Sequence, residues 1–145
     1  MRKIILLSVI VSSAAILMAA DLVPLNVTTG LWQCTMTSSI NGGPSNTSNY
    51  TSCVKASDLG SYPFTDPKAN CTWTVQNSTG TVMDATGTCM PQGMGKVSFT
   101  MHLVATDTQD VKGTGQMTIN LPNGATMNGN YSGSGKWASA TCPAK

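Results

Sequence analysis

The sequence has few of the residue types on which catalysis usually depends. It contains no glutamate, and His102 is its only histidine. A hydrolytic triad needs a base that a second group orients, and glycoside hydrolysis needs two carboxylates that face each other. Here alternation turns His102 away from the apolar face, and the six aspartates lie mostly in turns or loops. The sequence therefore indicates no catalytic residues and favours a protein that is not an enzyme.

Metal and redox motifs are also lacking. No two cysteines have the Cys-x-x-Cys spacing, which argues against a thioredoxin-type site and a zinc site. Thioethers bind Cu(I), so Met90, Met94 and Met101 are an alternative copper site. However, alternation puts Met83, Met101 and Met117 on the inward face, where methionine fills gaps. We therefore expect no metal and no cofactor.

Excess positive charge is absent once the first twenty residues are set aside. Arg2 and Lys3, the apolar stretch 4–18 and the small residues Ala19 and Ala20 form a signal-peptide pattern, with a membrane anchor as the alternative. In residues 21–145, six lysines balance six aspartates, which argues against nucleic-acid binding. We expect a signal peptide over 1–20 and a single β domain over 21–145. We also expect no membrane span after cleavage and a periplasmic or secreted location.

Period-two alternation recurs along residues 21–145, whereas helical periodicity is nearly absent. The alternating segments are LWQCTM (31–36), CTWTV (71–75), TVMDATGTC (81–89), VSFTMHLVA (97–105), VKGTGQMTINL (111–121) and NYSGSGKW (130–137). They predict an all-β fold, an antiparallel meander of about seven strands. We expect the meander to form a strongly curled sheet or a partial barrel, stapled by disulfides. Residues 40–49 are expected to be a flexible polar loop, and KASDLGSYPFTDPKAN (55–70) a short helical turn followed by an irregular segment.

Glycine alternates with the largest side chains in NYSGSGKW, on the face that should be apolar. The segment LPNGA predicts a three-residue loop with Gly124 in the left-handed region. This loop pairs Leu121 with Ala125 and sets Gly115 opposite Tyr131. An aromatic ring over a cross-strand glycine covers otherwise bare backbone, which explains the alternation.

A second hairpin is predicted at residues 78–80 by the same argument. A three-residue loop there sets Trp73 opposite Ala85 and Cys71 opposite Gly87. Both apolar faces then stay together, whereas a two-residue loop would reverse one strand and break this match.

Five cysteines in a chain expected to be exported indicate structural disulfides, and their odd number leaves one thiol unpaired. The register just described sets Cys89 diagonal to Cys71, which is an awkward geometry for a bridge. We therefore expect the bridges Cys53–Cys71 and Cys89–Cys142, with Cys34 as the unpaired thiol.

Five segments also carry a resemblance to a known family. They are GLW (30–32), SCVKASDL (52–59), CTWTVQNSTGTVMDATGTC (71–89), VKGTGQMT (111–118) and GKWASATC (135–142). In this order they resemble a bacterial family of small exported proteins, domain-of-unknown-function family 3617. The resemblance implies a β-rich domain in the bacterial envelope and no assigned activity. It also matches the four cysteines other than Cys34 to those of the family.

The functional hypothesis is a non-enzymatic envelope protein whose sheet binds an apolar small molecule, a lipid or a protein partner. An inward face of glycine, methionine and aromatic residues could leave space, as in small barrels. The candidate ligand-facing residues are Trp32, Trp73, Met101, Met117, Tyr131 and Trp137. The alternative is a structural or interaction module with a filled core, which contacts partners through its polar face or the loop INGGPSN. We expect a monomer in either case.

Overall fold

Seven β-strands and one short helix make up the part of the chain that the structure, a computed structural model, describes: residues 22–65, 70–91 and 95–143. The elements are β1 (Gly30–Ile40), β2 (Asn46–Val54), the 3-10 helix η1 (Ala56–Asp58), β3 (Cys71–Ser78), β4 (Val82–Cys89), β5 (Lys96–Ala105), β6 (Asp110–Asn120) and β7 (Thr126–Ser139). The short helical turn predicted within residues 55–70 is therefore confirmed as η1. The predicted signal peptide lies outside the described residues.

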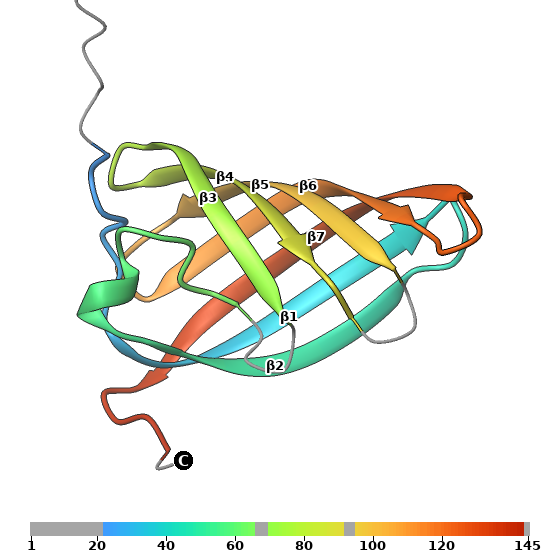
Figure 1. Cartoon of the computed structure of the whole chain (residues 1–145). Helices are drawn as coiled ribbons and strands as arrows, with labels where there is room; N and C mark the ends of the chain where they lie inside the picture. The colour runs from blue at the N-terminus through green and yellow to red at the C-terminus, as the bar shows by residue number, and fades with distance from the viewer. Residues whose placement is uncertain (1–21, 66–69, 92–94, 144–145) are drawn as a thin grey trace, which may run out of the picture.

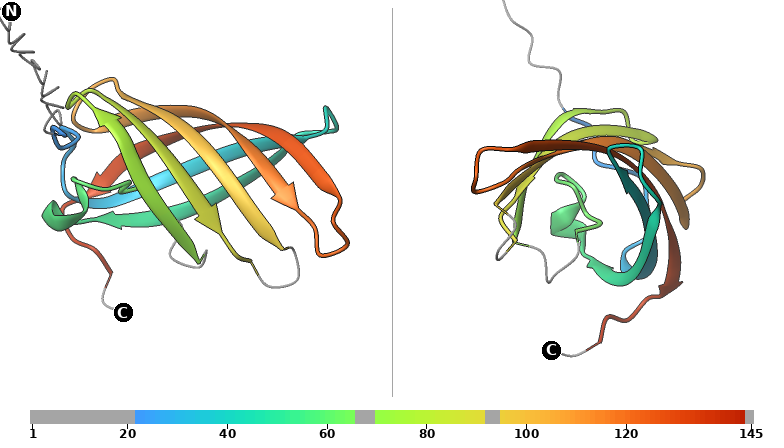
Figure 2. Two further views of the ribbon diagram at one scale, coloured as in Figure 1. Left: turned by 45° about the horizontal axis from the view of Figure 1, so that its top comes forward. Right: turned by 90° about the vertical axis from the view of Figure 1, so that its right-hand side faces the viewer.

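All seven strands belong to one antiparallel sheet, so the predicted all-β fold is confirmed (Figure 1). The strand order is β2-β1-β7-β6-β5-β4-β3, in which β1 pairs with β7, the last strand of the chain. The edge strands β2 and β3 do not pair, and the sheet is therefore open and not closed into a barrel. Figure 2 shows the sheet curving around the segment that carries η1 and the residues after it.

The predicted register of the β6–β7 hairpin is confirmed. Leu121 donates its N–H to the carbonyl of Ala125 at 2.8 Å, and Gly124 has a φ of +82° in the turn. Gly115 pairs with Tyr131, whose ring covers it: a Cβ at position 115 would lie 2.7 Å from the ring. Tyr131 is buried. The alternation of glycine and bulky residues thus builds a tightly packed inward face.

The predicted register of the β3–β4 hairpin is wrong. Trp73 pairs with Gly87 and Cys71 with Cys89, a shift of two residues from the expected partners. Gly80, with a φ of +89°, lies early in the turn and not at its end, so the strands reverse more tightly. An irregularity between Val75 and Asn77 supplies the one-residue offset that keeps the two apolar faces together.

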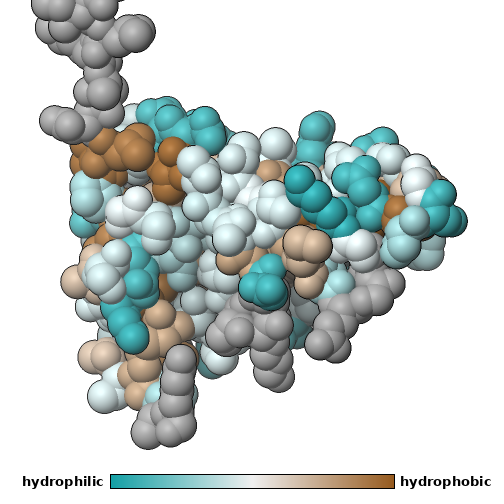
Figure 3. All heavy atoms as spheres, viewed as in Figure 1, coloured by the Kyte–Doolittle hydropathy of each residue, from teal (hydrophilic) through white to brown (hydrophobic). Residues whose placement is uncertain are grey.

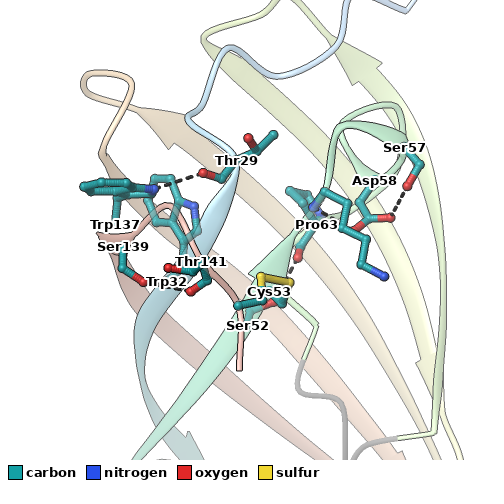
Figure 4. Close-up of a disulfide and its surroundings, with 12 residues drawn as sticks. Thr29, Trp32, Ser52, Cys53, Ser57, Asp58, Pro63, Trp137, Ser139 and Thr141 are labelled. Atoms are coloured by element: carbon teal, nitrogen blue, oxygen red, sulfur yellow. Dashed lines mark hydrogen bonds between the residues drawn. A yellow bond between two sulfur atoms is a disulfide. The ribbon is translucent and has the colours of Figure 1, made fainter. Parts of the chain in front are cut away.

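The expected disulfide pairing is also wrong, for the same physical reason. The bridges are Cys53–Cys142 and Cys71–Cys89, and Cys34 is a buried free thiol. The true register puts Cys71 directly opposite Cys89, with their Cα atoms 4.0 Å apart, where the expected one put them on a diagonal. The other bridge joins β2 to the chain beyond β7 (Figure 4).

Strand β2 was not predicted, because residues 40–49 were expected to be a loop. The turn is shorter than expected, over residues 41–45, and β2 begins at Asn46. Its first residues are exposed and polar at the edge of the sheet, so no apolar alternation marks them. Cross-strand pairs such as Thr37 with Thr47, whose hydroxyls lie 2.9 Å apart, hold this edge to β1.

Residues 22–28 close one end of the sheet. Leu25 is buried and donates its N–H to the carbonyl of Leu59, and Asn26 donates to that of Gly80. Leu22 and Val23 remain about half exposed. Figure 3 shows hydrophobic residues gathered at this end, whereas much of the remaining described surface in that view is polar.

Candidate functional site

The concave side of the sheet contains a cavity of about 140 Å³, which we call the aromatic cavity. Its walls come from β1 to β5, from β7 and from the segment after η1. The lining residues are Met36, Ser48, Tyr50, Tyr62, Phe64, Thr65, Cys71, Trp73, Cys89, Phe99, Met101 and Tyr131. None of these side chains carries a formal charge at neutral pH. The aromatic cavity is thus suited to an uncharged molecule, since a buried charge without a partner is strongly unfavourable.

Six of the eight aromatic side chains of the protein form one continuous chain of ring contacts. The rings follow one another in the order Trp32, Phe64, Tyr62, Trp73, Phe99 and Tyr131, with centroids 4.1 to 6.3 Å apart. The shortest contact is the stack of Tyr62 on Trp73, at an interplanar angle of 28°. Such contacts add to the stabilisation from burial and hold the rings in place.

Trp73 has an indole N–H that lacks a hydrogen-bond partner. The Nε1 atom is buried and unpaired, although the residue itself lines the aromatic cavity. The ring lies over Gly87 on β4, because a Cβ at position 87 would be 2.5 Å from its Cε3 atom. Buried donors are paired in most native proteins, so this N–H is a candidate contact for a ligand oxygen.

The segment after η1 is held against β2 by the hydroxyl groups of Ser52 and Tyr50, which donate to its carbonyl groups. Ser52 Oγ donates to the carbonyl of Pro63 at 3.0 Å (Figure 4), and Tyr50 Oη donates to that of Phe64 at 2.9 Å. Tyr62, Pro63 and Phe64 are all buried. These bonds fix two aromatic walls of the cavity although the segment has no regular secondary structure.

Two tyrosines of the aromatic cavity, Tyr62 and Tyr131, are neutral at physiological pH. Burial raises the pKa of Tyr131 above its ordinary value, and Tyr131 Oη donates to the carbonyl of Thr100 at 2.8 Å. Burial also raises the pKa of Tyr62, and the nearby Tyr50 adds to that effect. The hydroxyl groups therefore act as hydrogen-bond donors and do not introduce charge.

A second, smaller cavity of about 30 Å³ adjoins the aromatic cavity. The two share Met36, Tyr50, Tyr62, Phe64, Met101 and Tyr131 as lining residues. Only the smaller cavity is lined by Cys34. Burial raises the pKa of the Cys34 thiol to about 11, and a hydrogen bond with Tyr50 partly offsets this effect. The thiol is therefore protonated at neutral pH.

The six candidate ligand-facing residues have different surroundings. Trp73, Met101 and Tyr131 line the aromatic cavity. Trp32 is fully buried against Phe64 and lines neither of the two cavities. The other two candidates also lie elsewhere. Met117 is buried in a cluster with Val97, Ile119 and Tyr131 but does not itself line either cavity. Trp137 is half-buried, with Nε1 donating to the carbonyl of Thr29 (Figure 4).

Three aromatic residues that line the cavity, Tyr50, Tyr62 and Phe64, were not predicted from the sequence. The first lies on the unpredicted strand β2, and the other two lie in irregular chain where no periodicity marks a buried position. Their only signal was local. Two aromatic residues flank Pro63 in the interval between Cys53 and Cys71.

The convex face carries the polar groups that sequence analysis considered for chemistry. His102 Nδ1 lies 2.7 Å from Asp84 Oδ1, and both side chains are exposed.

The alternative copper site predicted from the sequence, Met90, Met94 and Met101, is not brought together. Met90 is exposed at the end of β4, whereas Met101 lines the cavities, and Met94 lies outside the described residues. The described residues therefore bring no such trio together.

Two further findings concern metal ions and membranes. In residues 22–65, 70–91 and 95–143, no three histidine, cysteine, aspartate or glutamate side chains are grouped so that they could hold a metal ion. Within those same ranges, there is no helix whose length and apolar character would let it span a bilayer.

Comparison with known proteins gives one match. A family model described as "Protein of unknown function (DUF3617)" matches residues 27–142, which include all seven strands. No curated protein and no solved structure matches the chain.

Proposed function

This chain belongs to the DUF3617 family, and we propose that it is a binding protein for small uncharged molecules outside the cytoplasm. The ligand that fits best has an apolar body of about one ring and a single hydrogen-bond acceptor, such as a carbonyl oxygen. It would occupy the aromatic cavity beside Trp73, and on binding the indole would shift to bring its buried Nε1–H to the ligand acceptor.

The unpaired N–H of Trp73 is the observation that carries this proposal. A buried donor without a partner is unfavourable by about 1–3 kcal/mol, and a ligand acceptor would remove that penalty on binding. The lining residues contain no charged group, so selectivity rests on shape and on this one donor.

The size of the aromatic cavity supports a small ligand. Its volume of about 140 Å³ is below the range of drug-sized sites, which hold about 300–1,000 Å³. An apolar cavity of about 150 Å³ is large enough for benzene. A molecule with a single substituted ring is therefore the ligand whose size fits the aromatic cavity best.

Two features support a location outside the cytoplasm. Structural disulfides persist in oxidising compartments, and this chain has two. The signal-peptide pattern in residues 1–20 points the same way. The bridges also support binding, because Cys71–Cys89 forms part of the cavity wall and limits its movement.

A matched pair of probes tests the proposal: acetophenone, which has a ring and a carbonyl, and ethylbenzene, which lacks the carbonyl. In ¹H–¹⁵N correlation spectra of the disulfide-bonded protein, acetophenone should shift the Trp73 indole signal. Acetophenone should also bind about threefold to tenfold more tightly than ethylbenzene, the value of one neutral hydrogen bond. Trp73→Phe keeps a ring and should remove this preference.

Trp137→Phe is the matched control, because its indole N–H already donates to Thr29. It should leave the preference intact. If neither probe shifts the Trp73 signal, or if Trp73→Phe keeps the full preference for acetophenone, the proposed site is wrong.

A further inference from the structure

The smaller cavity borders Gly133 on β7. This residue pairs with Gly113 on β6, so two strands meet there without side chains. A Cβ on Gly133 would lie 3.0 Å from the carbonyl oxygen of Thr35, because the backbone of β1 passes close to this residue. The glycines leave a space of about 30 Å³, which is large enough for a single ion but too small for a molecule with a ring.

Two methionine thioethers border this space. Met36 on β1 is the cross-strand partner of Gly133. From the other side, the side chain of Met101 reaches over β6, because its Sδ would be 3.0 Å from a Cβ on Gly113. Both methionines line the cavity, so two thioether side chains border it, one from β1 and one from β5.

The third sulfur comes from Cys34. Its Sγ would be 3.6 Å from a Cβ on Gly135, which lies two residues beyond Gly133 on β7. Cys34 is also two residues from Met36 on the same face of β1, and both line the cavity. One thiol and two thioethers thus surround one small space.

We propose that Cys34, Met36 and Met101 form a binding site for a soft monovalent cation, Cu(I). Thiolate and thioether ligands select Cu(I), whereas Mg²⁺ and Ca²⁺ need oxygen ligands and imidazole suits Zn²⁺. The described lining of the cavity offers neither carboxylate nor imidazole. On binding, the Cys34 thiol releases its proton to solvent, and its sulfur coordinates the metal. This site does not depend on the proposed binding of small molecules.

Competition with bicinchoninate tests the site. The disulfide-bonded protein is titrated without oxygen with the acetonitrile complex of Cu(I), so that no added reductant reaches the bridges. We expect one Cu(I) per chain and coordination by sulfur alone in X-ray absorption spectra. Met36→Leu, Met101→Leu and Cys34→Ser should each weaken binding by about tenfold or more, because each removes a ligand.

Two further variants test the position of β1 and the effect of packing. Gly133→Ala keeps all three sulfurs, but its methyl group would lie 3.0 Å from the carbonyl oxygen of Thr35 and push β1 away from β7, so it should also weaken binding. Met117→Leu changes a buried methionine that lines neither cavity, and this variant should bind Cu(I) as tightly as the wild type does. Trp73→Phe should also leave Cu(I) binding unchanged, which distinguishes this site from the aromatic cavity. The absence of Cu(I) uptake, or an equal loss in Met117→Leu, would overturn the proposal.

Discussion

Trp73 on β3 lies flat over its cross-strand partner Gly87 on β4, so closely that a single methyl group at position 87 would collide with the indole. The contact sets the position of the ring that lines the aromatic cavity and carries the unpaired N–H. It also explains why a glycine stands in the middle of an otherwise well-packed strand.

Gly87→Ala should displace the indole and destabilise the protein. Overpacking a tight site of this kind is unfavourable by about 1–3 kcal/mol. Urea unfolding measures the loss, and near-UV circular dichroism should report the moved ring. Gly60→Ala is the control, because a Cβ there meets no atom within 4 Å. Equal stability of the two variants would show that the Trp73–Gly87 contact is not as tight as described.

The two disulfides should differ in their contribution to stability. Cys53–Cys142 closes 89 residues of chain and Cys71–Cys89 closes 18. In the chain-entropy model, these loops stabilise the folded state by about 4.5 and about 3 kcal/mol. Replacing both cysteines of one bridge by alanine, and measuring the free energy of unfolding in urea, should show the larger loss for Cys53–Cys142. Peptide mapping of the native protein should recover the same two pairs, and a bridge to Cys34 would contradict the register.

Protein stability should fall at alkaline pH because of Cys34. The folded state raises the thiol pKa from 9.0 to about 11, so the unfolded chain loses the proton first. The contribution is therefore fully present below pH 9 and is lost as the pH rises from 9 toward 11. Urea unfolding across this range should show a shallower decline in Cys34→Ala than in the wild type. The same slope in both would exclude Cys34 as a source of this decline.

Ser52→Ala should loosen the segment that carries Tyr62 and Phe64. The change removes the donor to the buried carbonyl of Pro63, which is unfavourable by about 1–3 kcal/mol. Hydrogen exchange at the amides of Tyr62, Phe64 and Thr65 should become faster. Ser57→Ala, which loses only an exposed bond to Asp58, should leave these amides unchanged. Unchanged exchange in Ser52→Ala would mean that other contacts hold the segment.

Local turn chemistry explains which parts of the fold could be predicted. The β6–β7 register follows from Leu121–Ala125, where proline and glycine occupy positions that suit only one loop. The β3–β4 register fails because Gly80 suits two different turns, and the compensating irregularity near Gln76 has no sequence signal. The predicted pairing of the four bridged cysteines depended on that register, so it was wrong as well.

Non-local contacts explain most of what the sequence could not predict about the cavities. No sequence pattern shows that β1 pairs with β7, yet this pairing brings Cys34 and Met36 next to the glycines of β7. Likewise, Tyr62 reaches Trp73 only because the segment after η1 folds back under the sheet. Alternation did correctly predict that Trp73, Met101 and Tyr131 face inward.

Native mass spectrometry of the protein, purified without detergent from the cells that produce it, tests the binding function most directly. We expect an additional mass of one small organic molecule, which contains an oxygen and is released when the protein is unfolded in organic solvent. The same preparation of the Gly87→Ala variant, in which we expect the displaced indole to fill the cavity, should lack that mass. Wild-type protein with no bound molecule, and no response of the Trp73 indole to acetophenone, would contradict the account.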